Sequence, residues 1–481
     1  GDYHTGGHHP QKYPNTGMDG KSAYSLNTGL NFLEEHRIGV ALHGVQTEHA
    51  GSPGAFYDID RKTFLDMASS SCDLLYDGGY KDLGFSWKGR FFFCNDEHAN
   101  DFKHPADMNA WGDPRQLYFH ALNDYQGAQG QLSVKKSVLT LTGGVDWLSS
   151  DTDKKGSSYV YNEKYAYGNL GVFALAKIAL FDDRLIVSGG VRNETYRMET
   201  SGNNLERKKK SDKLDKTVPS FGVAFHVAEW LTMKGNYGEA YRIPNGLELM
   251  GFQGSVYPTL PNPDLKPEEA RSYDAGFEIR HKSLQIGLSY FETEYKKKII
   301  TMYTPPTWEA QSVNADGKIW MKGFEGNAGY DLGEAFGRPF KLRPYVNFTA
   351  LTECWAASGE NSSYSSVYKN KVPLVNDLEM GYGVQFAHPE VGFEADLRLT
   401  YVGYHYEQDW NETSPTYGQV VREGGKTIAD LFLRQKIYST DKAGTLSVYG
   451  EVRNILNERH ALIKDYPMPG RSVFIGLRYD Y

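Results

Sequence analysis

The last eleven residues of this 481-residue chain alternate strictly between two kinds of side chain. Side chains of a β-strand point to opposite sides in turn, so a strand over 471–481 separates them into two faces. One face carries Arg478 and Asp480 with Phe474 and Gly476, and the other carries apolar and aromatic residues only: Val473, Ile475, Leu477, Tyr479 and Tyr481. Such a strand suits a position between lipid and a water-filled lumen. The last strand of a soluble sandwich is the alternative that this segment alone leaves open.

The composition favours a membrane protein built of strands over one built of helices. No stretch approaches the roughly 20 apolar residues that a spanning helix needs, and the mean hydropathy is −0.56. The chain nevertheless holds 34 Tyr, 24 Phe and 8 Trp, which fits the aromatic girdles of a membrane barrel as well as a soluble all-β protein. The net charge of −8 gives no reason to expect a nucleic-acid partner.

The same alternation recurs along the chain, and the connections between the alternating segments are short and long in turn. This asymmetry is typical of a transmembrane antiparallel β-barrel, whose turns are short on one side and long on the other. Short turns are predicted near 34–37, 77–82, 135–137, 181–183, 228–229, 281–283, 331–339, 388–390 and 439–443. Long loops are predicted near 49–60, 96–116, 150–162, 201–214, 241–269, 300–316, 354–373, 406–425 and 457–470.

The strand count predicts an incomplete barrel. About nineteen strands are expected, the first at roughly 22–32 and the last at 471–481. Bacterial single-chain barrels have an even number of strands, so an odd number is missing at the front. Three more strands would complete a 22-stranded barrel, the size of plugged outer-membrane transporters. We therefore expect an all-β chain with residues 1–21 as the remnant of an extracellular loop and residues 22–481 as barrel.

Two sequence boxes lie on either side of a long loop. The first box is Tyr241-Arg242-Ile243-Pro244, and the second is Asn262-Pro263-Asp264-Leu265-Lys266-Pro267-Glu268. Both resemble boxes of the TonB-dependent receptor family. The segments 452–458 (Val-Arg-Asn-Ile-Leu-Asn-Glu) and 466–471 (Tyr-Pro-Met-Pro-Gly-Arg) are also similar to that family. The aromatic C-terminal residue resembles the assembly signal of outer-membrane barrels. The prolines stiffen the loop and end strand pairing, so we expect these motifs mainly to maintain the fold.

The resemblance implies an integral protein of the bacterial outer membrane with its long loops outside the cell. Members of the family import scarce nutrients such as ferric siderophores, haem, cobalamin or metals. Their N-terminal plug domain fills the barrel and engages TonB, and neither the plug nor the TonB-engaging segment is present in this sequence. The implied partners are outer-membrane lipid, the plug, TonB through the plug, and a small-molecule ligand. No intrinsic cofactor is implied; the expected transported ligand is a ferric siderophore or haem.

The ligand candidates lie in two of the predicted long loops. In the 241–269 loop, Phe252 and Tyr257 with Arg242 at the base suit a flat or anionic ligand. In the 96–116 loop, His98 and His104 lie with Trp111, and imidazoles are common ligands of transition metals. The alternatives are that the apolar residues seal the barrel mouth and that the histidines are solvated. No metal site is assigned.

The remaining observations concern other function classes. No catalytic constellation appears, so an enzyme is not expected. If the native protein lacks a plug, a passive porin-like channel is the alternative function, and a cobalamin or metal receptor is an alternative within the family. Cys72 and Cys94 are expected near opposite ends of neighbouring strands, too far apart for a disulfide, while Cys354 is placed in another outer loop.

Overall fold

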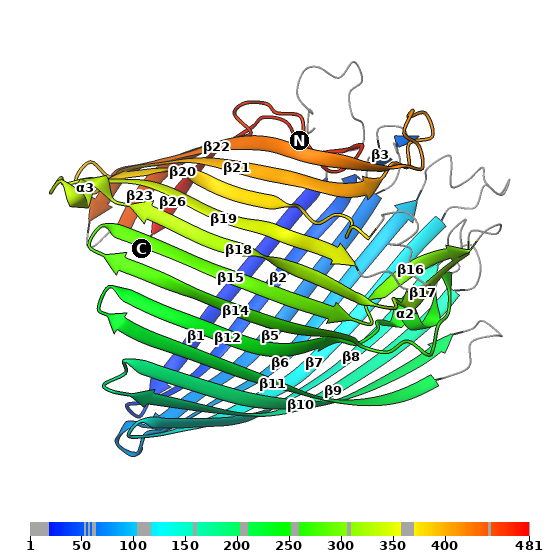
Figure 1. Ribbon diagram of the computed structural model, residues 1–481, viewed down its shortest axis with the longest axis horizontal. Coiled ribbons are helices and arrows are strands. Elements are labelled where there is room, and N and C mark those ends of the chain that lie inside the picture. The colour runs from blue at the N-terminus through cyan, green and yellow to red at the C-terminus, as the bar shows by residue number, and fades with distance from the viewer. Residues whose placement is uncertain are drawn as a thin grey trace.

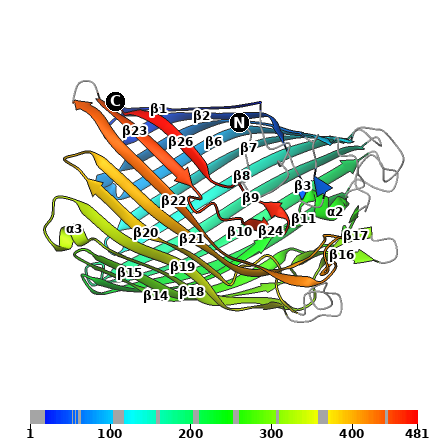
Figure 2. The ribbon, with the colours of Figure 1, turned by 90° about the horizontal axis from the view of Figure 1, so that it is seen from above.

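Among the residues that the structure describes, nineteen strands form a single antiparallel sheet that curves round on itself (Figures 1 and 2). The computed structural model describes residues 19–51, 54–55, 58–59, 64–102, 117–156, 161–202, 210–251, 259–304, 309–356, 370–440 and 444–480. In Figure 1 the early strands lie behind the later ones, as opposite sides of one curved wall. Each strand of the sheet pairs with the next one along the chain, so the predicted nineteen-stranded antiparallel architecture is confirmed.

The strands of this sheet are β1 (Gly20–Phe32), β2 (His36–Gly51), β5 (Phe64–Tyr80), β6 (Phe85–Phe102), β7 (Leu117–Lys136), β8 (Leu139–Gly156), β9 (Tyr161–Leu180), β10 (Leu185–Gly202), β11 (Lys210–Ala228), β12 (Leu231–Arg242), β14 (Glu268–His281), β15 (Leu284–Lys296), β18 (Lys318–Tyr330), β19 (Lys341–Ala356), β20 (Leu378–His388), β21 (Phe393–Gln408), β22 (Val420–Thr440), β23 (Gly444–Arg453) and β26 (Ser472–Asp480). Smaller elements occupy the connections: β3 (Gly54–Ala55), β4 (Asp58–Ile59), η1 (Lys81–Leu83), α2 (Gly246–Met250), β13 (Thr259–Leu260), β16 (Ile299–Thr304), β17 (Glu309–Asn314), α3 (Leu332–Ala335), β24 (Ala461–Ile463) and β25 (Tyr466–Pro467).

The two faces of the sheet differ as the alternation predicts. Val145 and Val172 lie opposite each other on β8 and β9, and their exposed fractions are 44% and 54%. On the other face, Asp146 and Glu194 both lie opposite Gly171. An apolar face left exposed around a polar interior is the arrangement of a membrane barrel, whose outer surface is covered by lipid. No helix among the described residues is long and apolar enough to cross a membrane.

The short turns lie near the positions predicted from the sequence, because a turn is determined by the few residues that form it. Positive φ angles occur at Leu33, Ser137 and Lys282, each between two successive strands. The long connections lie at the other end of the sheet, where α2, β16 and β17 are found (Figure 1). No plug domain is evident in the part of the chain that the structure describes. The division into a loop remnant at 1–21 and barrel from 22 onward stays a prediction, although β1 already begins at Gly20.

Three sequence-based placements are wrong because strands extend further than the loop signals suggested. His98 belongs to β6, opposite Met67 and Ala121, and not to a loop. Cys354 likewise belongs to β19, opposite Met321. Cys72 and Cys94 are close in register, since Cys72 pairs with Phe93 and Ser71 with Cys94. They project from opposite faces of the sheet, and all three cysteines are free.

Candidate functional site at the barrel rim

The first sequence box ends in an arginine that is held by two carboxylates. Arg242 is the last residue of β12 and lies opposite Glu268, the first residue of β14. Its guanidinium donates to Glu268 at 2.9 and 3.0 Å and to Glu248 of α2 at 2.9 Å from each of two nitrogens. Glu268 also accepts a 2.7 Å hydrogen bond from the amide of Ile299 in β16. Arg242 is therefore neutralised within the rim, and it fastens α2 and β16 to the barrel wall.

The second box is fastened to the small sheet β13–β17–β16. The Asn262 side chain donates to the carbonyl of Ser312 in β17 at 2.8 Å. The Lys266 amide donates to Asn314 Oδ1 at 2.7 Å, and Asn314 returns a 2.8 Å bond to the Lys266 carbonyl. Pro244 and Pro267, one from each box, are both buried. These contacts support the expectation that the two boxes maintain the rim.

A polar network just below the rim joins the lumen face of β8 and β10 to Tyr241 of β12. Arg192 of β10 donates to Asp146 of β8 at 2.5 Å and forms an ion pair with Glu194. The hydroxyls of Tyr196 and Tyr241 both donate to Glu194, and the two hydroxyls are 2.7 Å apart. The first box thus contributes Tyr241 to a network that spans β8, β10 and β12. Sequence reasoning missed this contact, because it depends on how three strands approach one another.

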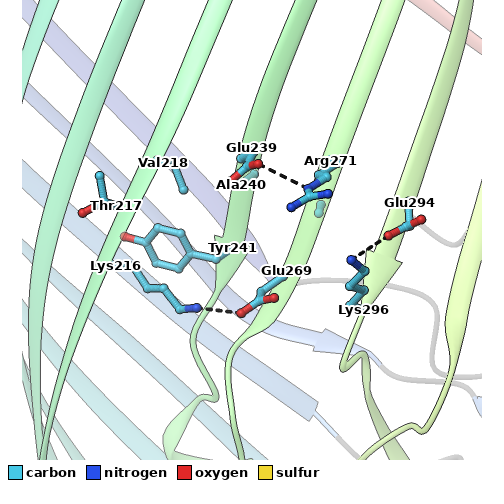
Figure 3. Close-up of a pocket in the computed structure, with 11 residues that line it drawn as sticks. Lys216, Thr217, Val218, Glu239, Ala240, Tyr241, Glu269, Arg271, Glu294 and Lys296 are labelled. Carbon is cyan, nitrogen blue, oxygen red and sulfur yellow. Dashed lines mark hydrogen bonds and ion pairs between the residues drawn. The ribbon is translucent and has the colours of Figure 1, made fainter.

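A cavity of about 160 Å³ lies beside this network, at the rim ends of β11 and β12, where these two strands are no longer paired. Figure 3 shows its charged lining, with the ion pairs Lys216–Glu269, Arg271–Glu239 and Lys296–Glu294. Six of the eleven residues that line the cavity are charged, so it suits a small charged group better than an apolar ligand. None of the sequence-predicted ligand candidates lines it; Tyr241 of the first box does.

The last long connection is fastened by a buried cluster of charges. Asp409, which follows β21, is fully buried, and Lys464 approaches its carboxylate at 3.5 Å. The Lys464 amide donates to the buried Glu407 at 2.8 Å. Burial alone would raise the pKa of Asp409, but hydrogen bonds from Ser414, Thr416 and the Asn411 amide, with the charge of Lys464, lower it to about 2. The carboxylate therefore holds the β24–β25 hairpin to the barrel at neutral pH.

The ligand candidates named from the sequence are not brought together by the described structure. Arg242 is occupied by carboxylates, and His98 lies in β6. Phe252, Tyr257, His104 and Trp111 lie outside the described residues. Among the residues that are described, no three His, Cys, Asp or Glu side chains are arranged to hold a metal ion.

A barrel with an apolar outer face, a polar lumen and an elaborated rim defines an outer-membrane receptor or channel. Residues 9–455 match the family described as "TonB dependent receptor-like, beta-barrel". The chain belongs to the TonB-dependent receptor family, and the resemblance seen in its sequence motifs is confirmed.

Curated relatives and solved structures agree with this assignment. The chain is 23% identical over 246 residues to the haemoglobin and haemoglobin-haptoglobin-binding protein A of Haemophilus influenzae, an alignment that covers 50% of this chain and 21% of the relative. It is 26% identical over 363 residues to the vitamin B12 transporter BtuB of Vibrio vulnificus, covering 75% of this chain and 49% of the relative. The chain thus spans less than half the length of these relatives.

Solved structures share the fold at low sequence identity. The copper transporter OprC superposes with a TM-score of 0.75 and 14% identity, covering 96% of this chain and 74% of that one. The Serratia marcescens haemophore receptor HasR, solved with its haemophore and haem, gives a TM-score of 0.71 at 16% identity, covering 98% and 73%. The FrpB iron transporter of Neisseria meningitidis gives 0.72 at 16%, covering 95% and 71%.

Proposed function

We propose that this chain is the barrel of a receptor that imports a scarce nutrient across the outer membrane with energy supplied through TonB. The observation that carries the proposal is the family match over residues 9–455 on a nineteen-stranded barrel. The energy would reach the ligand through a plug domain in the lumen, supplied by the same chain or a separate one. The long connections, with α2, β16 and β17, face the cell exterior, and the short turns face the periplasm.

The proposed cargo is iron, as a ferric siderophore or as haem. Support comes from relatives named for haemoglobin binding and from structural neighbours named as iron, haem and ferric-catecholate receptors. The vitamin B12 and copper transporters among the matches make cobalamin or a metal ion the alternative cargo within the same family. We propose no catalytic activity, since the family consists of receptors and transporters.

The experiment that tests this function uses the full-length protein in a Gram-negative host that lacks its own iron receptors. Growth on iron-depleted medium is measured with ferric siderophores, haem or haemoglobin as the only iron source. We expect rescue by one of them, and loss of the rescue when tonB is deleted. Growth that depends on cobalamin or copper supply instead would assign the alternative cargo.

A control separates import from passive flow. The same protein, purified and placed in lipid bilayers, is assayed for conductance and for uptake of uncharged sugars. A closed bilayer with TonB-dependent growth supports the receptor. A wide open pore in native material, with growth that is indifferent to TonB, would assign a porin-like channel.

A further inference from the structure

The barrel wall is interrupted between β11 and β12 near its outer end. The ladder between these strands ends at the pair Ser220–Gly238. Beyond it, β11 pairs with β10 as far as Lys210, and β12 pairs with β14 as far as Arg242. No backbone hydrogen bonds therefore join the two parts of the wall at this level, within the described residues.

The two parts of the wall are offset at the interruption. Lys216 lies opposite Glu194 on the lumen face of β10 and β11. Glu269 lies opposite Tyr241 on β12 and β14. Both residues belong to the outer face of these strands, which also carries the opposed tyrosines Tyr237 and Tyr273. Lys216 and Glu269 nevertheless form an ion pair of 2.6 Å. Lys216 on the inner face of β11 can reach Glu269 on the outer face of β14 only if the β10–β11 part of the wall lies outside the β12–β14 part there. The cavity lies in the step between these two parts. We call this cavity the wall notch; its lining residues are drawn in Figure 3.

The wall notch lies just above an aromatic belt. The rings of Tyr237 and Tyr273 are 5.1 Å apart on the face that carries the exposed Met233 further down β12. Two residues further towards the rim, the same face carries Glu239 opposite Arg271. Tyrosines of a membrane barrel mark the level of the lipid headgroups. The notch therefore opens at the level where headgroups carry their charges.

Three cations and three carboxylates line the wall notch. Two further lysines outside the lining pair with two of these carboxylates. The cations are Lys216, Arg271, Lys296, Lys297 and Lys318, and the carboxylates are Glu239, Glu269 and Glu294. The side chains of Arg271 and Lys296 are 51% and 35% exposed, so both can reach a ligand. Arginine and lysine are the residues that bind phosphate groups.

We propose that the wall notch binds the phosphorylated headgroup of an outer-leaflet glycolipid. The lipid's acyl chains lie against the apolar face below the belt, and a phosphate replaces part of the contacts that Arg271 and Lys296 make with Glu239 and Glu294. A headgroup in the step also seals the wall where the strands are not paired. This inference rests on the proposed orientation of the receptor, with this rim outside the cell.

The test measures binding of a bis-phosphorylated glycolipid, lipid A, to the full-length protein in mixed micelles, with dephosphorylated lipid A as the comparison. We expect the unaltered protein to prefer the phosphorylated form by about tenfold or more, since hydrogen bonds between charged groups are the strong ones. Equal binding of the two forms would overturn the proposal. Displacement of the lipid by millimolar inorganic phosphate would also overturn it, because the site would then take a free anion.

Variants locate the lipid on the barrel. The double variant Arg271→Gln, Lys296→Gln is expected to bind lipid A about tenfold more weakly. The matched control is Lys234→Gln, which removes a cation paired with Glu278 on the lumen face of the same two strands, β12 and β14. Heat-modifiable migration on gels shows that each variant is folded; if the double variant is not, Lys296→Gln alone takes its place. A loss of binding in the control as large as in the notch variant would refute this location.

The lipid readout is independent of transport. Iron-dependent growth without a preference for phosphorylated lipid would refute only the wall notch. Phosphate-dependent lipid binding without TonB-dependent growth would refute only the proposed function.

Discussion

Arg242 and Glu268 close the β12–β14 ladder as directly opposed residues, and two hydrogen bonds of 2.9 and 3.0 Å join their side chains. Glu268 is at the same time bonded to the amide of Ile299 at 2.7 Å. One ion pair thus connects the end of the barrel wall to the small sheet at its mouth. The position of this pair gives the positively charged motif residue a role in holding the rim together.

Arg242→Ala should loosen the rim without unfolding the barrel. The change leaves the mostly buried Glu268 carboxylate without its main partner, which typically costs about 1–3 kcal/mol. We expect amides of β16 and β17 to lose protection by that amount in hydrogen exchange, while amides of β8 to β10 stay unchanged. Arg280→Ala is the matched control, since the Arg280 side chain is 71% exposed and approaches Glu278 only at 3.4 Å. Equal effects of the two changes would contradict a special role of the rim pair.

Acid should release the loop that follows β21. The folded pKa of Asp409 is lowered to about 2, whereas an unfolded aspartate titrates near ~3.9. The stabilisation is therefore complete above about pH 4 and is lost as the pH falls through about 2. Hydrogen exchange at Asn411, whose amide donates to the Asp409 carboxylate at 3.0 Å, should quicken over this window after correction for intrinsic rates. Asp409→Asn should abolish the pH dependence; an unchanged profile in this variant would assign the effect to other groups.

The three cysteines should all be reduced in the mature protein, even in an oxidising compartment. Cys72 and Cys94 are near neighbours on β5 and β6, but their side chains leave the sheet on opposite faces. Cys354 lies on β19 opposite Met321, far along the sheet from both. Alkylation after denaturation without reductant should therefore add three labels per chain by mass spectrometry. A mass lower by two labels would show a disulfide and refute the register of these strands.

The sequence was sufficient for the architecture because its signals are local. Alternation marks each strand, and turn residues such as Leu33 and Lys282 mark where the chain reverses. Strand ends were harder to place. β6 continues as a polar ribbon to Phe102, so His98 read as a loop residue although it is paired on both sides. Beyond the membrane, charged residues occur in the ends of strands as well as in loops, so charge alone does not show where a strand ends.

The site was harder to predict than the fold because it depends on contacts between strands. Arg242 looked like a cation at the base of a binding loop, and only the fold brings Glu248 and Glu268 to it. Lys216 meets Glu269 because the ladder between β11 and β12 ends early. The alternation of polar and apolar residues in the sequence does not indicate where a ladder ends. Register and strand offset are properties of pairs, so a single sequence gives little information on them.

The two edges of the sheet predict what completes the barrel. β1 pairs with β2 and β26 with β23, and within the described residues no bond joins β1 to β26. Among the described residues each of these two strands therefore has one partner strand, and both edges are open. As the first and nineteenth strands of an antiparallel sheet they run in the same direction, so only an odd number of further strands can close it with antiparallel pairs; three would give the expected 22. An open edge in a bilayer leaves backbone groups without partners, so it must be paired.

In the native particle, the outward-pointing amides of β1 and β26 should therefore exchange hydrogen as slowly as those of the interior strand β8. Residues 1–481 refolded alone should show fast exchange at these edges, because half of the amides in an edge strand have no partner. Amides of β2, which are paired on both sides, are the control in each sample. Fast exchange at β1 and β26 in native membranes would show that the edges remain open there, and the 22-stranded barrel would be wrong.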